Sequence, residues 1–156
     1  MSTVNNLLSP INFVFRIADA PKMEYLVQKV NIPGVTLGTA DIPTPFVKLS
    51  QPGNISYDPL RVEFKVSEEL ESYLEIYNWM VTLGHPDDLG QYRNRRSDLS
   101  VLVLNSAKRP IMNITFTNAY PLNLTPIDLD VTMESLQYVT AQATFNFDRM
   151  YYNSLS

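Results

Sequence analysis

The sequence predicts a mainly β domain: an antiparallel β-sandwich or barrel with one α-helix on its flank. Three segments, 11–17, 60–66 and 136–147, alternate between apolar and polar residues, and this two-residue period is typical of strands with one buried face. Only the segment 67–84 has the 3.6-residue period of a long helix. About six to eight strands and a single helix favour a β layer with the helix packed against it.

Length and composition restrict the kind of protein this is. The 156 residues suit a single domain, residues 1–156, large enough for a buried core. The net charge of -4 gives no reason to expect general affinity for nucleic acid. The lack of cysteine excludes disulfides and thiolate nucleophiles, and a single histidine excludes a two-histidine metal site. Without a signal-peptide pattern or an apolar run of about 20 residues, we expect no Sec export and no membrane binding.

Two strands are predicted before residue 33. The first is the alternating segment 11–17, whose buried face comprises Ile11, Phe13, Phe15 and Ile17. The second is the segment 24–32, which ends at the turn residues Pro33 and Gly34. Its apolar face comprises Leu26, Val30 and Ile32.

Residues 33–59 form a proline-rich segment that is not a polar linker, because apolar side chains recur throughout it. So long a connection without structure is uncommon in a compact domain, and we expect an ordered arm or a loose hairpin with edge-strand prolines. Its apolar side chains need a surface to cover, either in this domain or in a neighbouring chain. We expect residues 35–52 to pack on an adjacent subunit or ring. The candidate interface residues are Val35, Leu37, Ile42 and Phe46.

The segment 67–84 is the predicted helix. Ser67 can accept hydrogen bonds from the first-turn N–H groups, and Gly84 can end the helix in the left-handed conformation. The expected core-facing stripe, roughly 120° wide, comprises Leu70, Tyr73, Leu74, Tyr77, Met80 and Val81. The flank beside it comprises Ile76, Trp79 and Leu83. That flank either sinks into its own domain or meets a second subunit, which makes Trp79 a further candidate interface residue.

A polar loop at 85–98 separates the helix from two further strands. Strands at 99–105 and 111–118 are predicted to form a hairpin. The second strand is expected to break at the Asn-Ala-Tyr-Pro run, residues 118–121. The loop contains an arginine cluster, Arg93, Arg95 and Arg96. The cluster is either solvated or contacts an acidic protein surface or phosphate.

Residues 136–147 predict the longest strand, nearly 40 Å at about 3.3 Å per residue. One side is apolar and includes Phe145 and Phe147, so it faces the core. The other side is polar and uncharged. It comprises Tyr138, Thr140, Gln142, Thr144 and Asn146.

No arrangement of residues points to catalysis. His85 has Asp87 and Asp88 close by in the sequence, but nothing marks an activated serine. Asp128 and Asp130 would share one face of a strand, which suits either a cation site or a solvated edge. We therefore expect a protein that is not an enzyme and that needs no cofactor or metal.

The order and spacing of several segments resemble a known family. The points of likeness are the first strand at 13–17, the Asn-Ile-Pro-Gly-Val run at 31–35, the helix with Trp79, the Asn-Ala-Tyr-Pro run at 118–121 and the closing strand at 137–147. Together they resemble the tube-forming proteins of contractile phage tails of the T4 type, a superfamily that includes the type VI secretion tube protein. The resemblance covers most of the chain from about residue 11 onward.

This resemblance implies a β-sandwich or barrel with one flanking helix, whose strands join those of neighbouring subunits into one continuous ring barrel. It implies a virion protein of the tail, assembled in the host cytoplasm, that forms stacked hexameric rings and contacts the sheath and the baseplate hub. DNA would leave the capsid through the channel without specific binding. A polar strand face suits the wall of a wet channel, so the five polar residues of the last strand are candidates for the lumen.

Two other functions stay open. The chain could be the initiator that connects the tube to the baseplate hub, or another tube-like ring at the baseplate or the tail end. Outside phage tails, it could be a β-sandwich binding module, for instance for a glycan, with Tyr92, Tyr120 and Tyr138 as a platform. A ring or tube in negative-stain images would separate the ring protein from the binding module, which would be a monomer.

Overall fold

The computed structural model describes residues 7–8, 10–17, 24, 26–85, 96–132 and 138–155. It confirms the mainly β class, with one α-helix among the described residues. The elements are β1 (Phe13–Ile17), β2 (Val27–Asn31), β3 (Val35–Ile42), β4 (Leu49–Tyr57), β5 (Leu60–Lys65), α2 (Glu71–Gly84), β6 (Ser97–Leu104), β7 (Pro110–Leu124), β8 (Thr140–Asn146) and β9 (Arg149–Ser154).

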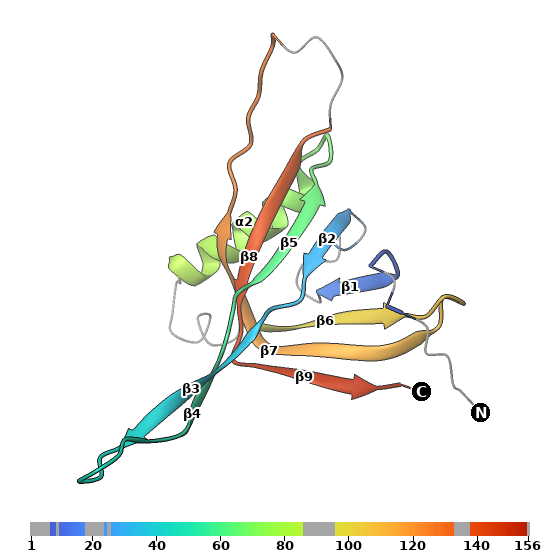
Figure 1. Cartoon of the computed structure of the whole chain (residues 1–156). Coiled ribbons are helices and arrows are strands. Elements are labelled where there is room, and N and C mark those ends of the chain that lie inside the picture. The colour runs from blue at the N-terminus through green and yellow to red at the C-terminus, as the bar shows by residue number, and fades with distance from the viewer. Residues whose placement is uncertain are drawn as a thin grey trace.

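The strands form two layers that cross each other, and every pairing is antiparallel (Figure 1). The order along the main sheet is β1-β6-β7-β8-β5-β2, and β9 pairs with β7 on the side opposite β6. One layer contains β1, β6, β9 and the first part of β7; the other contains β2, β5, β8 and the last part of β7. β1 and β2 lie at the two ends of this order and do not pair with each other, so the described chain is an open barrel with free edges. A third pair, β3 and β4, forms a sheet of its own.

Strand β7 joins the two layers through a bend at Asn118. Residues 110–119 pair with β6, whereas residues 120–124 pair with β8. Asn118 has φ 50°, a left-handed conformation that asparagine tolerates better than most residues. Its N–H donates to Asp98 (3.1 Å), and its side-chain amide donates to Asp148 (2.9 Å). The predicted break at 118–121 is therefore wrong: the strand bends there and continues, because these side chains hold the corner.

The core between the layers follows the predicted alternation closely in β5. Leu60, Val62 and Phe64 are fully buried, and the charged residues between them face outward. Two aromatic contacts join parts of the chain that are distant in sequence. Phe116 lies edge-on to Phe147 with ring centroids 4.9 Å apart, and Tyr57 lies 5.5 Å from the same ring. The first strand begins later than predicted, and Ile11 is exposed.

The helix is rotated relative to the predicted stripe. It begins at Glu71, whose N–H donates to the Ser67 hydroxyl (3.1 Å), and its buried residues are Ser72, Ile76 and Trp79. Leu74 and Tyr77, placed mid-stripe by the sequence, are 42% and 51% exposed. Two anchors set this rotation.

The first anchor is the Ser72 hydroxyl, which donates to the carbonyl of Lys65 (3.2 Å) and lets the helix start approach β5 closely. The second is Trp79, the largest side chain of the helix, whose ring lies 6.0 Å from that of Phe145. Burying so large an aromatic outweighs burying a leucine. The assignment of Trp79 to a subunit interface is therefore wrong, because the side chain is 1% exposed and belongs to the core.

The C-terminal strand is shorter than predicted and is followed by another. β8 ends at Asn146, the chain turns at Asp148, whose N–H donates to the carbonyl of Thr117 (2.9 Å), and β9 then runs back along β7. The single strand at 136–147 was thus too long, and β9 was missed. Its sequence, RMYYNS, buries only Met150 and shows no alternation that would mark a strand.

The rotation of the helix gives a stability test. Ile76→Ala should lower the free energy of unfolding by about 2–5 kcal/mol, because it leaves a cavity in the core. Leu74→Ala is the matched control on the exposed side and should cost less than about 1 kcal/mol. Urea denaturation of the two variants checks this. Equal losses, or a larger loss for Leu74→Ala, would contradict the observed orientation.

Candidate assembly surfaces

Three surfaces are candidates for function: the outward face of the β2-β5-β8 layer, the β3–β4 hairpin and a groove between β1 and β2. Among the described residues, no group of three or more His, Asp or Glu side chains could hold a metal ion. Asp130 instead accepts hydrogen bonds from the hydroxyl (2.6 Å) and the N–H (2.9 Å) of Thr132, which lower the pKa of its carboxyl. Its visible role is to fix a local turn. None of the described helices is long and apolar enough to cross a membrane.

The candidate lumen residues lie on the outward face of β8 and just before it. Ala141, Ala143 and Phe145 point into the core, so the residues between them point away from it. Tyr138, Thr140 and Asn146 are exposed, and Gln142 and Thr144 are half-buried. The structure thus places all five on one side of the sheet, as the alternation predicts.

The surface around these residues is not neutral, however. The register sets Arg61 opposite Thr144, Glu63 opposite Gln142 and Lys65 opposite Thr140. β2 adds Lys29 opposite Glu63. The β5 alternation already indicated that its charged residues face outward, but the sequence did not show that β5 is the neighbour of β8.

Both ends of this face carry a cation beside a tyrosine. The Lys65 ammonium lies 4.9 Å from the centre of the Tyr138 ring. At the other end, the Arg96 guanidinium lies 5.1 Å from the Tyr120 ring, and the Asn146 amide donates to the Tyr120 hydroxyl (3.1 Å). Each contact is a cation–π interaction that holds a flexible side chain against the sheet.

These positions bear on two sequence-based alternatives. Of the arginine cluster, Arg96 packs on the sheet, whereas Arg93 and Arg95 lie outside the described residues, as does Tyr92. Tyr120 pairs with the last residue of β8 and Tyr138 precedes the first, so a strand of about 20 Å separates them. The two tyrosines therefore do not form one platform for a ligand.

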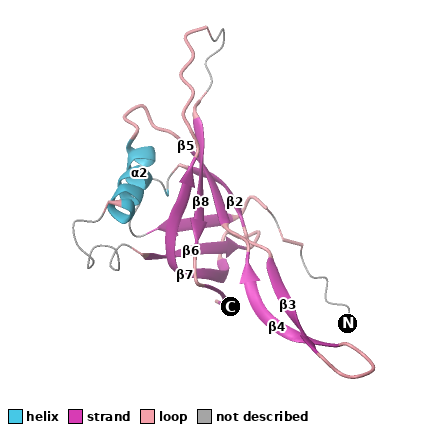
Figure 2. Cartoon of the chain, turned by 90° about the vertical axis from the view of Figure 1, so that its left-hand side faces the viewer, coloured by secondary structure: helices cyan, strands magenta, loops and turns pink. Residues whose placement is uncertain are grey.

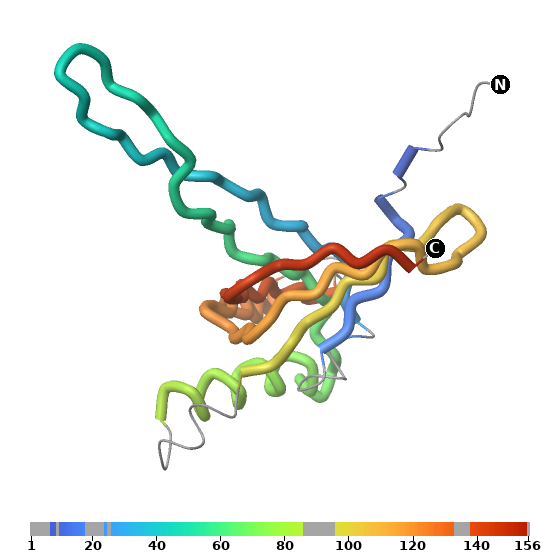
Figure 3. The backbone as a smooth tube through the Cα atoms, turned by 90° about the horizontal axis from the view of Figure 1, so that it is seen from below, coloured from blue at the N-terminus to red at the C-terminus, as the bar shows by residue number. Residues whose placement is uncertain are grey.

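The second surface is the β3–β4 hairpin, which projects away from the two layers (Figures 1, 2 and 3). Its strands pair with each other and with no other described strand, which confirms the hairpin interpretation of the arm. Phe46 at its tip is 95% exposed. The other exposed apolar residues are Val35, Leu37, Ile42, Val47, Leu49 and Ile55. A lone two-stranded hairpin is marginally stable in water, so this one is expected to gain stability from a partner surface.

The register gives the hairpin two apolar patches on opposite faces. Near the base, Val35 pairs with Tyr57 and Leu37 pairs with Ile55; near the tip, Ile42 pairs with Leu49. Between them, β4 advances three residues (55 to 52) while β3 advances two (37 to 39), which is a bulge in β4. Because side chains alternate, Ile42, seven residues after Val35, already points to the other face of β3. The extra residue in β4 brings Leu49 to that same face, opposite Ile42.

Two glycines lie at this bulge. A side-chain carbon on Gly53 would lie 3.1 Å from the backbone of Gly38, so a larger residue would fit there only if the strands moved slightly apart. We call the first set (Val35, Leu37, Ile55, Tyr57) the base patch. We call the second set (Ile42, Phe46, Val47, Leu49) the tip patch.

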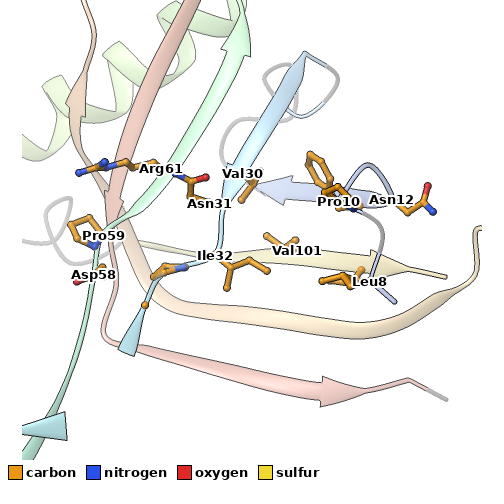
Figure 4. Close-up of a pocket in the computed structure, with 14 residues that line it drawn as sticks. Leu8, Pro10, Asn12, Val30, Asn31, Ile32, Asp58, Pro59, Arg61 and Val101 are labelled. Atoms are coloured by element: carbon orange, nitrogen blue, oxygen red, sulfur yellow. The ribbon is translucent and has the colours of Figure 1, made fainter. Parts of the chain in front are cut away.

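The third surface, missed by the sequence analysis, is a groove of about 710 Å³ between the edge strands β1 and β2 (Figure 4). Its lining includes Leu8, Val30, Ile32, Val101 and Val103. The groove exists because the barrel does not close within one chain. No local sequence signal marks it, since it depends on which strands fail to pair.

Free strand edges and a hairpin with exposed apolar side chains are the features typical of a structural subunit that assembles with other chains. Two solved structures share the fold. The anti-feeding prophage cap, a tube terminating cap, has a TM-score of 0.75 at 16% identity, over 99% of this chain and 95% of that chain. The sheath/tube terminator of PVC, an extracellular contractile injection system, has a TM-score of 0.74 at 16% identity, over 97% and 99%.

Sequence comparison is more specific. The tail tube terminator protein of Enterobacteria phage T4 is 31% identical over 129 residues, which cover 77% of this chain and 72% of that protein. The family model of the T4-like virus tail tube protein gp19 matches residues 9–150. This chain belongs to that family of structural tail proteins, which confirms the resemblance inferred from the sequence.

The uncovered hairpin gives a test by hydrogen exchange. In an isolated monomer, backbone amides of residues 35–52 should exchange much faster than those of β5, because nothing but the partner strand covers them. In an assembled form they should be protected. Equal protection of the segment in both states would contradict a role for the hairpin between subunits.

Proposed function

We propose that this chain is a tail tube terminator: a ring-forming structural protein that sits at the end of a contractile tail tube. The observation that carries the proposal is its 31% identity to the T4 tail tube terminator protein over most of both chains. The sequence alone favoured the tube subunit first and the initiator second. The relationship to a terminator places the tail-end ring ahead of both, and the tube and initiator roles become outcomes of the test below.

The free edges of the fold support assembly into a closed ring. Within the described ranges β1 and β2 each have one unpaired side, and exposed edges invite pairing with another chain. A surface that binds a different surface on the next copy generates a ring when the rotation closes. The hexamer implied by the family resemblance would cover these edges and join the open layers into one barrel.

A terminator built on the tube fold explains how growth stops. One face of such a ring matches the last ring of the tube and docks on it. The other face does not offer the surface that a further tube ring needs, so addition ends there. In this role the protein is a virion component, assembled in the host cytoplasm, whose neighbours include the tube and the sheath.

In the ring, the outward face of β2, β5 and β8 would line the channel through which DNA leaves. The wall would be polar, with Arg61 and Lys65 as cations and Glu63 between them. Phosphate contacts of cations hold DNA without reading its sequence, and carboxylates oppose them. Interspersed charges of both signs let DNA pass without specific binding.

Tail length in phage particles that lack this protein tests the terminator role. Without a terminator, tubes should still form but should vary in length and lack a joined capsid. Loss of the tube subunit would instead leave no tubes, and loss of an initiator would leave baseplates without tubes. Tubes of normal, uniform length would contradict the proposal.

The channel assignment gives a second prediction. Thr140→Lys with Gln142→Lys should leave folding within about 0.5 kcal/mol, since both sites are on the outward face. DNA ejection should slow, most strongly at low salt, because added cations bind phosphate. Ser106→Lys with Ala107→Lys, in an exposed turn, is the matched control and should not slow it. Ejection unchanged at low salt in the first variant would remove this face from the channel wall.

A further inference from the structure

The groove between β1 and β2 has an apolar floor, and part of its rim is apolar as well. Val101 and Val103 of β6 are buried beneath it, and Val30 lies on its β2 side (Figure 4). At the rim, Leu8 is 69% exposed and Ile32 is 41% exposed. Apolar side chains gathered at an open groove are typical of a site that another apolar segment covers.

Two strand edges bound the groove. β1 pairs only with β6, and β2 pairs only with β5, so each keeps one side free of strand partners among the described residues. A groove between two free edges over an apolar floor suits an extended or hairpin segment with apolar side chains.

The groove also has a charged end. Asp58 and Arg61 line it and are exposed. In the turn of the hairpin, Lys48 is exposed and follows Val47 of the tip patch. The tip and the groove therefore both combine apolar side chains with exposed charge, and Lys48 is opposite in sign to Asp58.

We propose that the groove receives the tip of the β3–β4 hairpin of a second copy of this chain. The tip patch covers Leu8 and Ile32 at the rim, and Lys48 approaches Asp58. This inference rests on the proposed ring-forming function and names the contact that closes the ring. Because the tip and the groove are different surfaces, the contact runs head to tail, as a closed ring requires.

The hairpin of the same chain cannot fill this groove. Its base forms one wall, because Gly34 and Asp58, where the hairpin leaves and rejoins the domain, both line the groove and are joined by a hydrogen bond from the Asp58 N–H (3.0 Å). From that base the hairpin extends away from the layers (Figures 1 and 3). The tip consequently has to come from a different molecule.

Disulfide trapping tests the proposal in the full-length chain, which has no cysteine of its own. A size-tagged chain with Val47→Cys is mixed with an untagged chain with Ile32→Cys and oxidised. A mixed disulfide can then form only between molecules. The control partner is Leu129→Cys, which is more exposed than Ile32 (88% against 41%) but lies outside the groove. We expect the mixed dimer to exceed the control by at least about fivefold, since disulfides need Cα atoms within about 7 Å.

Charge reversal gives an independent readout of the same contact. Lys48→Glu or Asp58→Lys alone should weaken assembly by about tenfold or more, and the two together should restore it to within a few fold. An assembly that forms normally without the mixed disulfide and without charge rescue overturns the groove as the hairpin site but leaves the ring intact. A chain that stays monomeric at every concentration overturns both.

Discussion

Strand β7 belongs to both layers of this fold, and the rest of the structure depends on its bend at Asn118. The bend turns one continuous strand from the β6–β9 layer to the β8–β5 layer, which places Phe116 and Phe145 in one core. Asp98 and Asp148 hold the corner from two different elements. The layers cross, and β1 and β2 lie at the two ends of the strand order without pairing in the described chain. We call the gap between them, where the groove lies, the open seam.

The open seam and the hairpin are complementary features of an incomplete unit. The chain buries a well-formed core, with Trp79 and Phe145 joining the helix to the sheet, so it folds as a domain. Yet its edges, the groove and the two hairpin patches have no partner within the described chain. These are the surfaces that the proposed ring would cover, in keeping with membership of a tail tube family.

Local sequence patterns predicted the features that depend only on residues close in the sequence, such as which strand residues are buried. The alternation in β5 and β8 correctly separated buried from outward residues, and the prolines and glycines of 33–59 correctly indicated a hairpin. Contacts between distant segments decided the rest. The Ser72 and Trp79 anchors rotated the helix, the corner at Asn118 kept β7 continuous, and β9 formed because β7 had a free side. The charges that β5 places beside β8 follow from strand pairing, which no single segment reveals.

The central claim is that one chain is an incomplete unit that closes with copies of itself. Native mass spectrometry of the purified full-length chain, across a range of concentrations, tests it most directly. The account predicts a closed oligomer of defined mass, a hexamer by family resemblance, in place of an open-ended series. A monomer at all concentrations, or an unlimited ladder of sizes, would contradict it.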